Sequence, residues 1–424
     1  MKKLLLLFAL AVIAMPCRAH CPSSCTSNEI WYTNGSATEP TNPREEDDFG
    51  VNIISNTYDS EKECWVIKFD GDVTTIGDFA FGYCSSLTSI TIPDSVTTIG
   101  NGIFAGCSNL TEFNGKYASE DGRCLIIDGT LNSFAPAGLT EYNIPDSVTT
   151  IGDLAFADCS SLRSVTIPDS VTTIGEWAFS YCSSLTSVTI GDSVTTIGGY
   201  AFDGCSSLRS VTIPDSVTTI GEYAFSVCGN LTSITIPDSV TTIGEFAFRD
   251  CSSLINVTIP DSVTTIGDGA FWECGSLTSI TIPDGVTAIG GGALSGCSSL
   301  TSVTIPDSVT TIGKWAFADC SSLTSVTIGD SVTTIGGYAF QDCSSLTSVT
   351  IPNSVTTIGE EAFANCESLT SVYCKAITPP AGGSDIFSRN ASGRKIYVPM
   401  QSVEAYKSAC YWSDYKSSIV GYNF

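Results

Sequence analysis

Histidine and positive charge are scarce in this sequence, and both shortages exclude large classes of function. Its 424 residues include a single histidine, His20, and 18 lysines and arginines against 44 aspartates and glutamates. A Ser-His-Asp hydrolase, a Cys-His protease and a zinc site built on two or three imidazoles all need more histidine. At a net charge of −26 the chain also lacks the clustered Lys and Arg that bind nucleic-acid phosphates or anionic membranes. We therefore expect no nucleic-acid partner, no cofactor and no metal site.

The chain also lacks an apolar run of the about 20 residues that a membrane-spanning helix needs. Its longest such run, residues 4–15, follows two lysines and ends shortly before the small residue Ala19. This arrangement is typical of a secretory signal peptide, so we assign residues 1–19 to one that is cleaved after Ala19. Lipid attachment at Cys17 is the alternative, which the preceding Ala-Met-Pro disfavours. We predict a mature chain that does not span a membrane and is secreted or displayed on the cell surface.

The sequence is rich, by contrast, in a repeat of 23 residues. From Leu162 to Cys366, segments such as LRSVTIPDSVTTIGEWAFSYCSS follow one another without a slip, and the Ile-Gly pair recurs twelve times along the chain. Periods of 20–29 residues with regularly spaced apolar positions indicate a leucine-rich-repeat solenoid. We predict one continuous solenoid of about twelve or thirteen coils over residues 73–371, and not a row of separate globular domains.

Each repeat predicts a β-rich coil. In Leu185–Ile190, β-branched residues alternate with Ser and Thr, which indicates a strand with one buried face. A Pro-Asp or Gly-Asp turn and a second extended segment, such as Val194–Ile197, follow. Residues 176–182 then predict a helical or 3₁₀ turn that buries its Ala, Phe and Cys. One coil buries too little apolar surface to offset its loss of conformational entropy, so it needs neighbours and caps.

The two ends of the chain lack the repeat, and we interpret them as caps. Residues 20–72 form the predicted N-terminal β-rich cap, and residues 372–424 form the C-terminal cap. Capping segments cover the terminal coil and its strand edge. The expected elements are strands over 30–33, 51–55 and 65–69 in the first cap, and a strand over 395–398 and a helix over 402–408 in the second.

One coil, residues 110–138, is 29 residues long and has neither the Ile-Gly nor the Ala-Phe signature. Its Asp128-Gly129 pair stands between two apolar segments, which predicts a β-hairpin. A structural irregularity is the favoured interpretation. The alternative is a projecting hairpin that gives the rod a unique binding feature.

The repeat pattern LxxVxIPxxVxxIGxxAFxxCxx resembles that of the BspA-like leucine-rich-repeat proteins over roughly residues 73–371. The irregular SEDGRCLIIDGTL segment and the later ASGRKIYVP are similar to the same family. This resemblance implies an exported surface protein of host-associated microbes, which adheres by non-catalytic binding to proteins or glycans of a host or of other microbes. It carries no catalytic residues over to this chain. A monomeric adhesin is therefore the expected function, and a structural spacer without its own ligand is the alternative.

The cysteines fall into two groups. One cysteine closes each coil on the same side as the buried phenylalanine, as Cys182 does, and we predict a column of buried thiols because cysteine is among the most buried residues. The others lie near the ends, where an exported chain permits oxidation. Cys21 could pair with Cys25, and Cys374 with Cys410.

A row of aspartates follows the proline positions, once in each coil. Aspartate suits such turns because its side chain bonds the local backbone. A calcium-binding edge stays open as an alternative, although the repeat differs from the glycine-rich calcium-binding pattern. A glycosidase is disfavoured, since equivalent acids offer no environment that separates an acid from a base. The row comprises Asp169, Asp192, Asp215, Asp238, Asp261 and their equivalents.

Large aromatic residues recur two positions after the Ile-Gly glycine. Their spacing places them beside, and not on, the buried Ala-Phe-Cys face, so they either form an exposed binding stripe or shield the corners of the coils. The column comprises Phe79, Trp177, Tyr200, Tyr223, Phe246, Trp315 and Tyr338.

The first strand of each coil is expected to turn hydroxyl groups outward. Ser187, Thr189, Ser210 and Thr212 are examples. Such an array either keeps the rod soluble or meets a repetitive ligand through many weak contacts.

Overall fold

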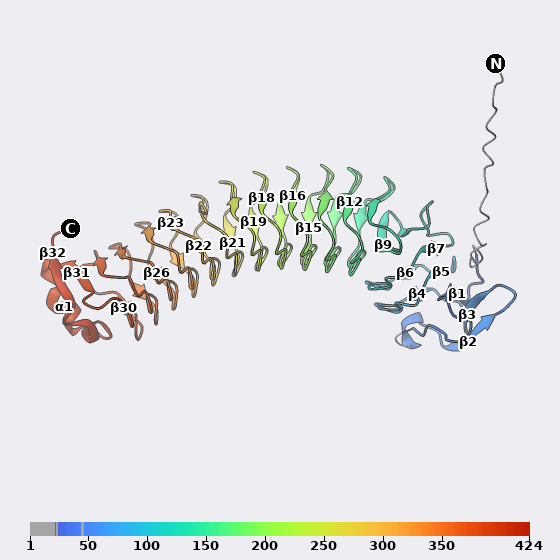
Figure 1. Cartoon of the computed structure of the whole chain (residues 1–424), viewed down its shortest axis with the longest axis horizontal. Coiled ribbons are helices and arrows are strands. Elements are labelled where there is room, and N and C mark those ends of the chain that lie inside the picture. Colours follow the sequence, from blue (N-terminus) through green and yellow to red (C-terminus); the bar gives the residue numbers. More distant parts are fainter. Residues whose placement is uncertain (1–21, 23, 44–45) are drawn as a thin grey trace, which may run out of the picture.

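The computed structural model describes residues 22, 24–43 and 46–424, and it shows a curved rod of stacked coils (Figure 1). The rod is a β-solenoid of about 15 turns, which confirms the predicted fold class. The turn count exceeds the predicted twelve or thirteen because strands beyond residue 371 continue the stack. The predicted signal peptide, His20 and Cys21 lie outside the described residues.

The first strand of most coils pairs in parallel with its equivalent in the next coil, and between residues 141 and 422 these strands form three separate sheets. Ser187 lies opposite Ser210, and Val188 opposite Val211, so each residue type forms a straight row along the rod. The valine side chains are buried and the hydroxyls are exposed. These strands are β10 (Glu141–Asn143), β12 (Ser164–Thr166), β14 (Ser187–Thr189), β16 (Ser210–Thr212), β18 (Ser233–Thr235), β20 (Asn256–Thr258), β23 (Ser302–Ile305), β25 (Ser325–Ile328), β27 (Ser348–Ile351) and β29 (Ser371–Cys374).

The second strand of each coil is a Thr-Ile pair, and these pairs form most of a 13-stranded sheet that runs from β8 to β30. The isoleucine is buried in every coil of this sheet that carries it. The strands are β11 (Thr150–Ile151), β13 (Thr173–Ile174), β15 (Thr196–Ile197), β17 (Thr219–Ile220), β19 (Thr242–Ile243), β21 (Thr265–Ile266), β22 (Ala288–Ile289), β24 (Thr311–Ile312), β26 (Thr334–Ile335), β28 (Thr357–Ile358) and β30 (Ala381–Gly382).

The predicted helical or 3₁₀ turn is instead a series of hydrogen-bonded turns, and the reason is its backbone. Trp177 and Tyr181 have φ angles of 58° and 56°, a left-handed conformation that a helix excludes. This conformation directs alternate N–H groups at the next coil: those of Trp177, Phe179 and Tyr181 donate to carbonyls there at 2.9, 2.8 and 2.7 Å. Hydrogen bonds between coils therefore replace those within a helix.

The core of the rod is a continuous stack of equivalent side chains. The rings of Phe179, Phe202, Phe225 and Phe248 are fully buried and stack at centroid distances of 5.1 to 5.6 Å. One hydrophobic cluster extends from Cys124 to Ile419, and a second, smaller one holds the N-terminal coils. The two clusters meet at the irregular coil.

The irregular coil holds the predicted hairpin. β8 (Cys124–Ile127) and β9 (Thr130–Phe134) are antiparallel, and Asp128 and Gly129 between them have φ angles of 49° and 78°. β9 also pairs in parallel with β11, so the hairpin closes one end of the 13-stranded sheet. It is built into the solenoid, and the alternative of a projecting hairpin is wrong.

The N-terminal segment attaches to the first coil through an antiparallel strand. β1 pairs with β3 on one side and with β5 on the other, which covers the edge of the first coil. The elements here are β1 (Glu29–Thr33), the 3₁₀ helix η1 (Glu46–Phe49), β2 (Ile53–Asp59), β3 (Cys64–Phe69), β4 (Thr75–Ile76), β5 (Ser89–Thr91), β6 (Thr98–Ile99) and β7 (Glu112–Asn114).

The C-terminal segment adds two parallel strands with a short helix between them. β31 (Lys395–Pro399) pairs with β29, and β32 (Ile419–Tyr422) pairs with β31. The helix α1 (Val403–Ser408), flanked by η2 (Met400–Ser402) and η3 (Trp412–Tyr415), lies at this end of the rod (Figure 1). Within the described residues, none of the helices has the length and apolar character needed to cross a bilayer.

Candidate functional site

Four members of the predicted aromatic column form one continuous stack, which we call the aromatic ladder: Trp177, Tyr200, Tyr223 and Phe246. Their ring centroids are 3.8, 4.6 and 4.8 Å apart in order, with interplanar angles of 6°, 7° and 21°. All four side chains are half-buried. Consecutive coils place them in one row, because each occupies the same position of the repeat.

The other three predicted residues stand apart from this stack. Trp315, which is 42% exposed, stacks with Tyr338 at 5.6 Å, and the Lys314 ammonium lies over both rings at 4.3 and 5.1 Å. Phe79 lies near the N-terminal end, where its ring covers Gly102 of the next coil. The column therefore forms three groups, of which the aromatic ladder is the largest.

Every residue of the aromatic ladder has a left-handed backbone, with φ between 52° and 58°. Residues with a Cβ lose about 1–2 kcal/mol in this conformation relative to the right-handed one. Gly269 and Gly292 occupy the same position in later coils, as do Leu154 and Glu361 elsewhere. The coil therefore closes equally with glycine, an aliphatic residue or an acid. The aromatic rings are not needed for the backbone to turn.

At the end of the ladder one ring packs over the neighbouring coil. The ring of Phe246 leans over Gly269, where a Cβ would collide with it, and Trp272 lies 6.0 Å beyond Phe246. Trp272 comes three positions after Gly269, so it does not belong to the predicted column. The glycine at the column position was the sequence signal that a ring from another position of the coil lies there.

A row of carboxylates accompanies the aromatic ladder, and we call it the acidic row: Glu176, Glu222 and Glu245. Each directly precedes a ladder residue and is exposed. None takes part in an ion pair among the described residues. The pKa of Tyr200 is raised mainly by burial, and to a smaller extent by the neighbouring Tyr223 and Glu222.

The predicted hydroxyl array is present in the structure. Ser187, Thr189, Ser210 and Thr212 are exposed on β14 and β16 in straight register. Along each coil the Pro-Asp or Gly-Asp turn and the second strand separate this array from the aromatic ladder. Within the described part of the chain, no three Asp, Glu, His or Cys side chains converge as a metal site would require.

From Cys182 to Cys366 the cysteine column consists of buried free thiols, and each donates to a carbonyl oxygen of the preceding coil, as Cys205 does to Phe179 at 3.2 Å. Cys84, at the N-terminal end of the column, is half-buried. The suggested Cys374–Cys410 disulfide is wrong for this structure: Cys374 is buried 3.2 Å from the Tyr406 hydroxyl, whereas Cys410 is exposed, and both are free. Cys25 is a half-buried free thiol, and its suggested partner lies outside the described residues.

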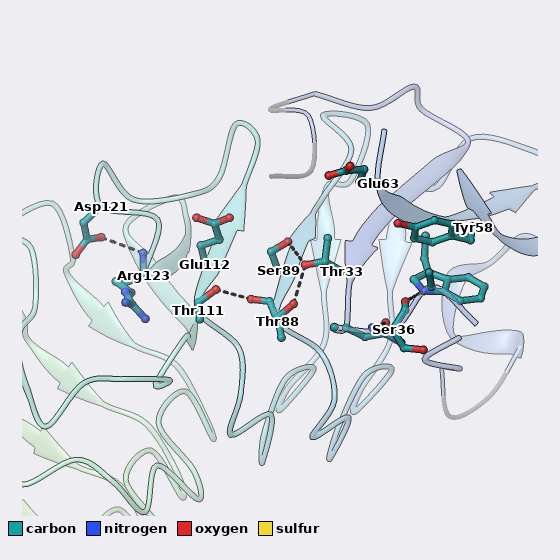
Figure 2. Close-up of a pocket in the computed structure, with 14 residues that line it drawn as sticks. Thr33, Ser36, Tyr58, Glu63, Thr88, Ser89, Thr111, Glu112, Asp121 and Arg123 are labelled. Carbon is teal, nitrogen blue, oxygen red and sulfur yellow. Dashed lines mark hydrogen bonds between the residues drawn. The ribbon is translucent and has the colours of Figure 1, made fainter. Parts of the chain in front are cut away.

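Sequence reasoning missed a pocket of about 580 Å³ between the N-terminal strands and the irregular coil. Figure 2 shows its lining in one row from Asp121 and Arg123, through Thr88 and Thr33, to Tyr58. These residues come from segments far apart in the sequence, so no local motif marks them. The one local signal was an acid, Glu112, at a strand position that holds serine in most coils.

The pocket lining is polar and fixed by its own hydrogen bonds. The Thr33 hydroxyl bonds those of Thr88 and Ser89, each at 2.7 Å. The Arg123 guanidinium donates to two backbone carbonyls at 3.2 and 2.9 Å. Burial raises the pKa of Asp121, but hydrogen bonds from Ser119, from a backbone N–H and from Tyr142 outweigh it and lower that pKa. The pocket is open and polar, with Tyr58 as an aromatic wall.

The chain matches the family model of the BspA type leucine rich repeat region. The matched segments are residues 51–119, 130–232, 178–301, 218–347 and 264–392. The chain belongs to this family. Leucine-rich-repeat solenoids of the BspA type are typically binding or surface proteins and not enzymes. No functionally curated protein matches the sequence.

Solved structures of bacterial leucine-rich-repeat proteins are similar to this chain. A leucine-rich repeat protein from Bacteroides ovatus is 30% identical over 83% of this chain and 88% of that chain, with a TM-score of 0.58. One from Eubacterium ventriosum is 29% identical over 68% and 80%, with a TM-score of 0.50. A leucine rich cell surface protein from Faecalibacterium prausnitzii is 30% identical over 83% and 84%, with a TM-score of 0.46.

Proposed function

We propose that this chain is an exported, surface-displayed adhesin that binds an extracellular protein through its aromatic ladder, without catalysis. The observation that carries the proposal is the stack of Trp177, Tyr200, Tyr223 and Phe246 at positions where the coil closes equally well with glycine. Half-exposed Trp and Tyr are the side chains most enriched where proteins bind proteins. Since the coil also closes without these rings, their half-exposed stack supports a role in recognition.

Surface display rests on two further observations. The N-terminal residues have the composition of a secretory signal peptide. A relative that is 30% identical is described as a leucine rich cell surface protein. Antibody labelling of intact cells tests this part of the proposal: we expect labelling without permeabilisation, and labelling only after permeabilisation would contradict it.

Binding itself is tested with an array of matrix proteins and glycans. We expect the mature protein to bind a few array members saturably, and a variant with serine at all four ladder positions to lose that binding. The matched control removes the separate Trp315–Tyr338 pair, also by serine. Binding that survives the ladder variant, or that the control abolishes equally, would contradict the assignment.

A structural spacer is the second candidate function. The regularity of the hydroxyl rows and the continuous core favour a rod whose main property is its length. In that case we expect no array member to bind, and we expect the protein to lose its spacing function when whole 23-residue coils are removed from the rod.

A further inference from the structure

The aromatic ladder offers ring edges to a partner, and hardly any ring face. Adjacent centroids lie 3.8 to 4.8 Å apart with nearly parallel planes, which leaves no space for a further ring between them. At the C-terminal end Trp272 already lies against Phe246. A sugar ring stacks on an aromatic face, so it finds no platform inside the ladder. Aliphatic and aromatic side chains of a protein can pack along such edges and beside the tyrosine hydroxyls.

The acidic row determines which protein surfaces fit beside these edges. Glu176, Glu222 and Glu245 lie one residue before Trp177, Tyr223 and Phe246. Glu222 and Glu245 belong to successive coils about 4.8 Å apart, well within the Debye length of about 8 Å at physiological salt, so their charges act together. Glu176 lies two coils, about 10 Å, before Glu222, because Gly199 holds the position between them, and it adds to this field more weakly. Since no cation of the described residues pairs with them, their field is available to a partner.

We propose that the aromatic ladder and the acidic row together bind a protein segment that carries both lysine or arginine and large apolar side chains. This inference rests on the proposed function and names the chemistry of its partner. The apolar side chains pack against the exposed edges of the aromatic ladder, while the cationic groups pair with the acidic row. Neither feature alone would distinguish such a segment from any basic or any apolar surface.

Three synthetic peptides of about twelve residues and one linear glucan oligosaccharide test this proposal on the full mature protein. The peptides alternate Lys with Leu, Lys with Ser, and Glu with Leu. By fluorescence anisotropy we expect the Lys-Leu peptide to bind saturably, the Lys-Ser peptide to bind about tenfold more weakly, and the other two probes not to bind. Absence of Lys-Leu binding, or equal binding of Lys-Ser, overturns the inference.

Variants of the protein locate the contact. Replacing the acidic row by Glu176→Gln, Glu222→Gln and Glu245→Gln should weaken Lys-Leu binding about tenfold and flatten its salt dependence. The matched control, Asp215→Asn, Asp238→Asn and Asp261→Asn, changes the net charge equally in the exposed turns, where Asn353 is already native. Equal losses in both variants would show a general charge effect and overturn the inference.

Failure of this inference is distinguishable from failure of the proposed function. If the glucan binds and the four-serine ladder variant abolishes that binding, the adhesin stands but its partner is a glycan. If the array yields a protein partner whose affinity changes neither with salt nor with the three Glu→Gln substitutions, the aromatic ladder alone accounts for binding. Both results overturn the partner chemistry argued from the acidic row.

Discussion

Aromatic residues in a left-handed backbone are the most unusual feature of this chain at the scale of single residues. Most side chains avoid this conformation, which favours glycine and, to a lesser degree, asparagine and aspartate. Here the repeat imposes it on whatever residue follows the Ile-Gly pair by two positions. Trp177, Tyr200 and Tyr223 fill it, although Gly292 shows that glycine suffices. Stacking between coils offsets part of the strain, at about 0.5–1.5 kcal/mol for each aromatic pair.

This balance predicts a small effect of Trp177→Gly on stability. The substitution relieves the left-handed strain and loses one stacking contact, so the two changes of about 1 kcal/mol each oppose one another. In contrast, Phe179→Ala in the buried stack should destabilise by about 3–5 kcal/mol. Thermal unfolding of both variants beside the parent checks this. A large loss from Trp177→Gly would show that the ring is structural.

The buried thiols predict a loss of stability in alkali. Burial raises the pKa of Cys251 and of Cys320 to about 12, from an ordinary value of 9.0. Because the folded pKa is the higher one, the stabilisation is complete below pH 9 and is lost as the pH rises from 9 towards 12. Each such thiol contributes a loss of about 1.4 kcal/mol per pH unit in that window.

Melting temperatures at pH 8 and pH 10.5 measure this loss. We expect a steep fall between them, and a smaller fall in a Cys251→Ala, Cys320→Ala variant compared with its own pH 8 value. An equal fall in the parent and the variant would refute the role of the thiols.

At the scale of the structural element, the irregular coil depends on its hairpin turn. Gly129 has a φ of 78°, and a Cβ there would lie 2.7 Å from the Thr149 hydroxyl oxygen. Gly138 has the same φ of 78° but open space around it. An alanine at Gly138 would therefore introduce backbone strain alone, whereas an alanine at Gly129 would introduce the same strain and a steric collision.

We expect Gly129→Ala to destabilise the protein more than Gly138→Ala does. The control loses about 1–2 kcal/mol through the left-handed backbone alone, and the hairpin variant loses the cost of displacing Thr149 as well. Urea unfolding midpoints compare the two. Equal midpoints would mean that the hairpin moves freely and does not hold the end of the 13-stranded sheet.

The elements also show how far the sequence determines the structure. The 23-residue period predicts the strands, the buried Phe and Cys stacks and the aromatic column, because an unbroken repeat places equivalent residues in register. It does not reveal the left-handed turns, since the spacing of Ala178, Phe179 and Cys182 is equally consistent with one helical turn. The pocket beside Tyr58 and Arg123 depends on packing between distant segments, which no local pattern encodes.

At the scale of the whole molecule, two hydrophobic clusters meet at the irregular coil. Solenoids are stabilised coil by coil through neighbours, so a weak junction can separate two unfolding units. We expect the N-terminal coils, around Ile67 and Phe113, to exchange amide hydrogens at a lower urea concentration than the longer C-terminal stack around Phe225. Hydrogen exchange followed by mass spectrometry resolves both regions. A single urea midpoint for all core peptides would contradict two units.

The role of the aromatic ladder in recognition is tested most simply by measuring binding after its replacement by serine. We expect the parent protein and the Trp315→Ser, Tyr338→Ser control to bind the same array member, and the Trp177→Ser, Tyr200→Ser, Tyr223→Ser, Phe246→Ser variant not to bind it. All three should have melting temperatures within a few degrees of one another, because residues as different as Leu154 and Glu361 occupy this position in other coils and each lost stacking contact costs only about 0.5–1.5 kcal/mol. Undiminished binding by the folded four-serine variant would show that the aromatic ladder is not the binding site.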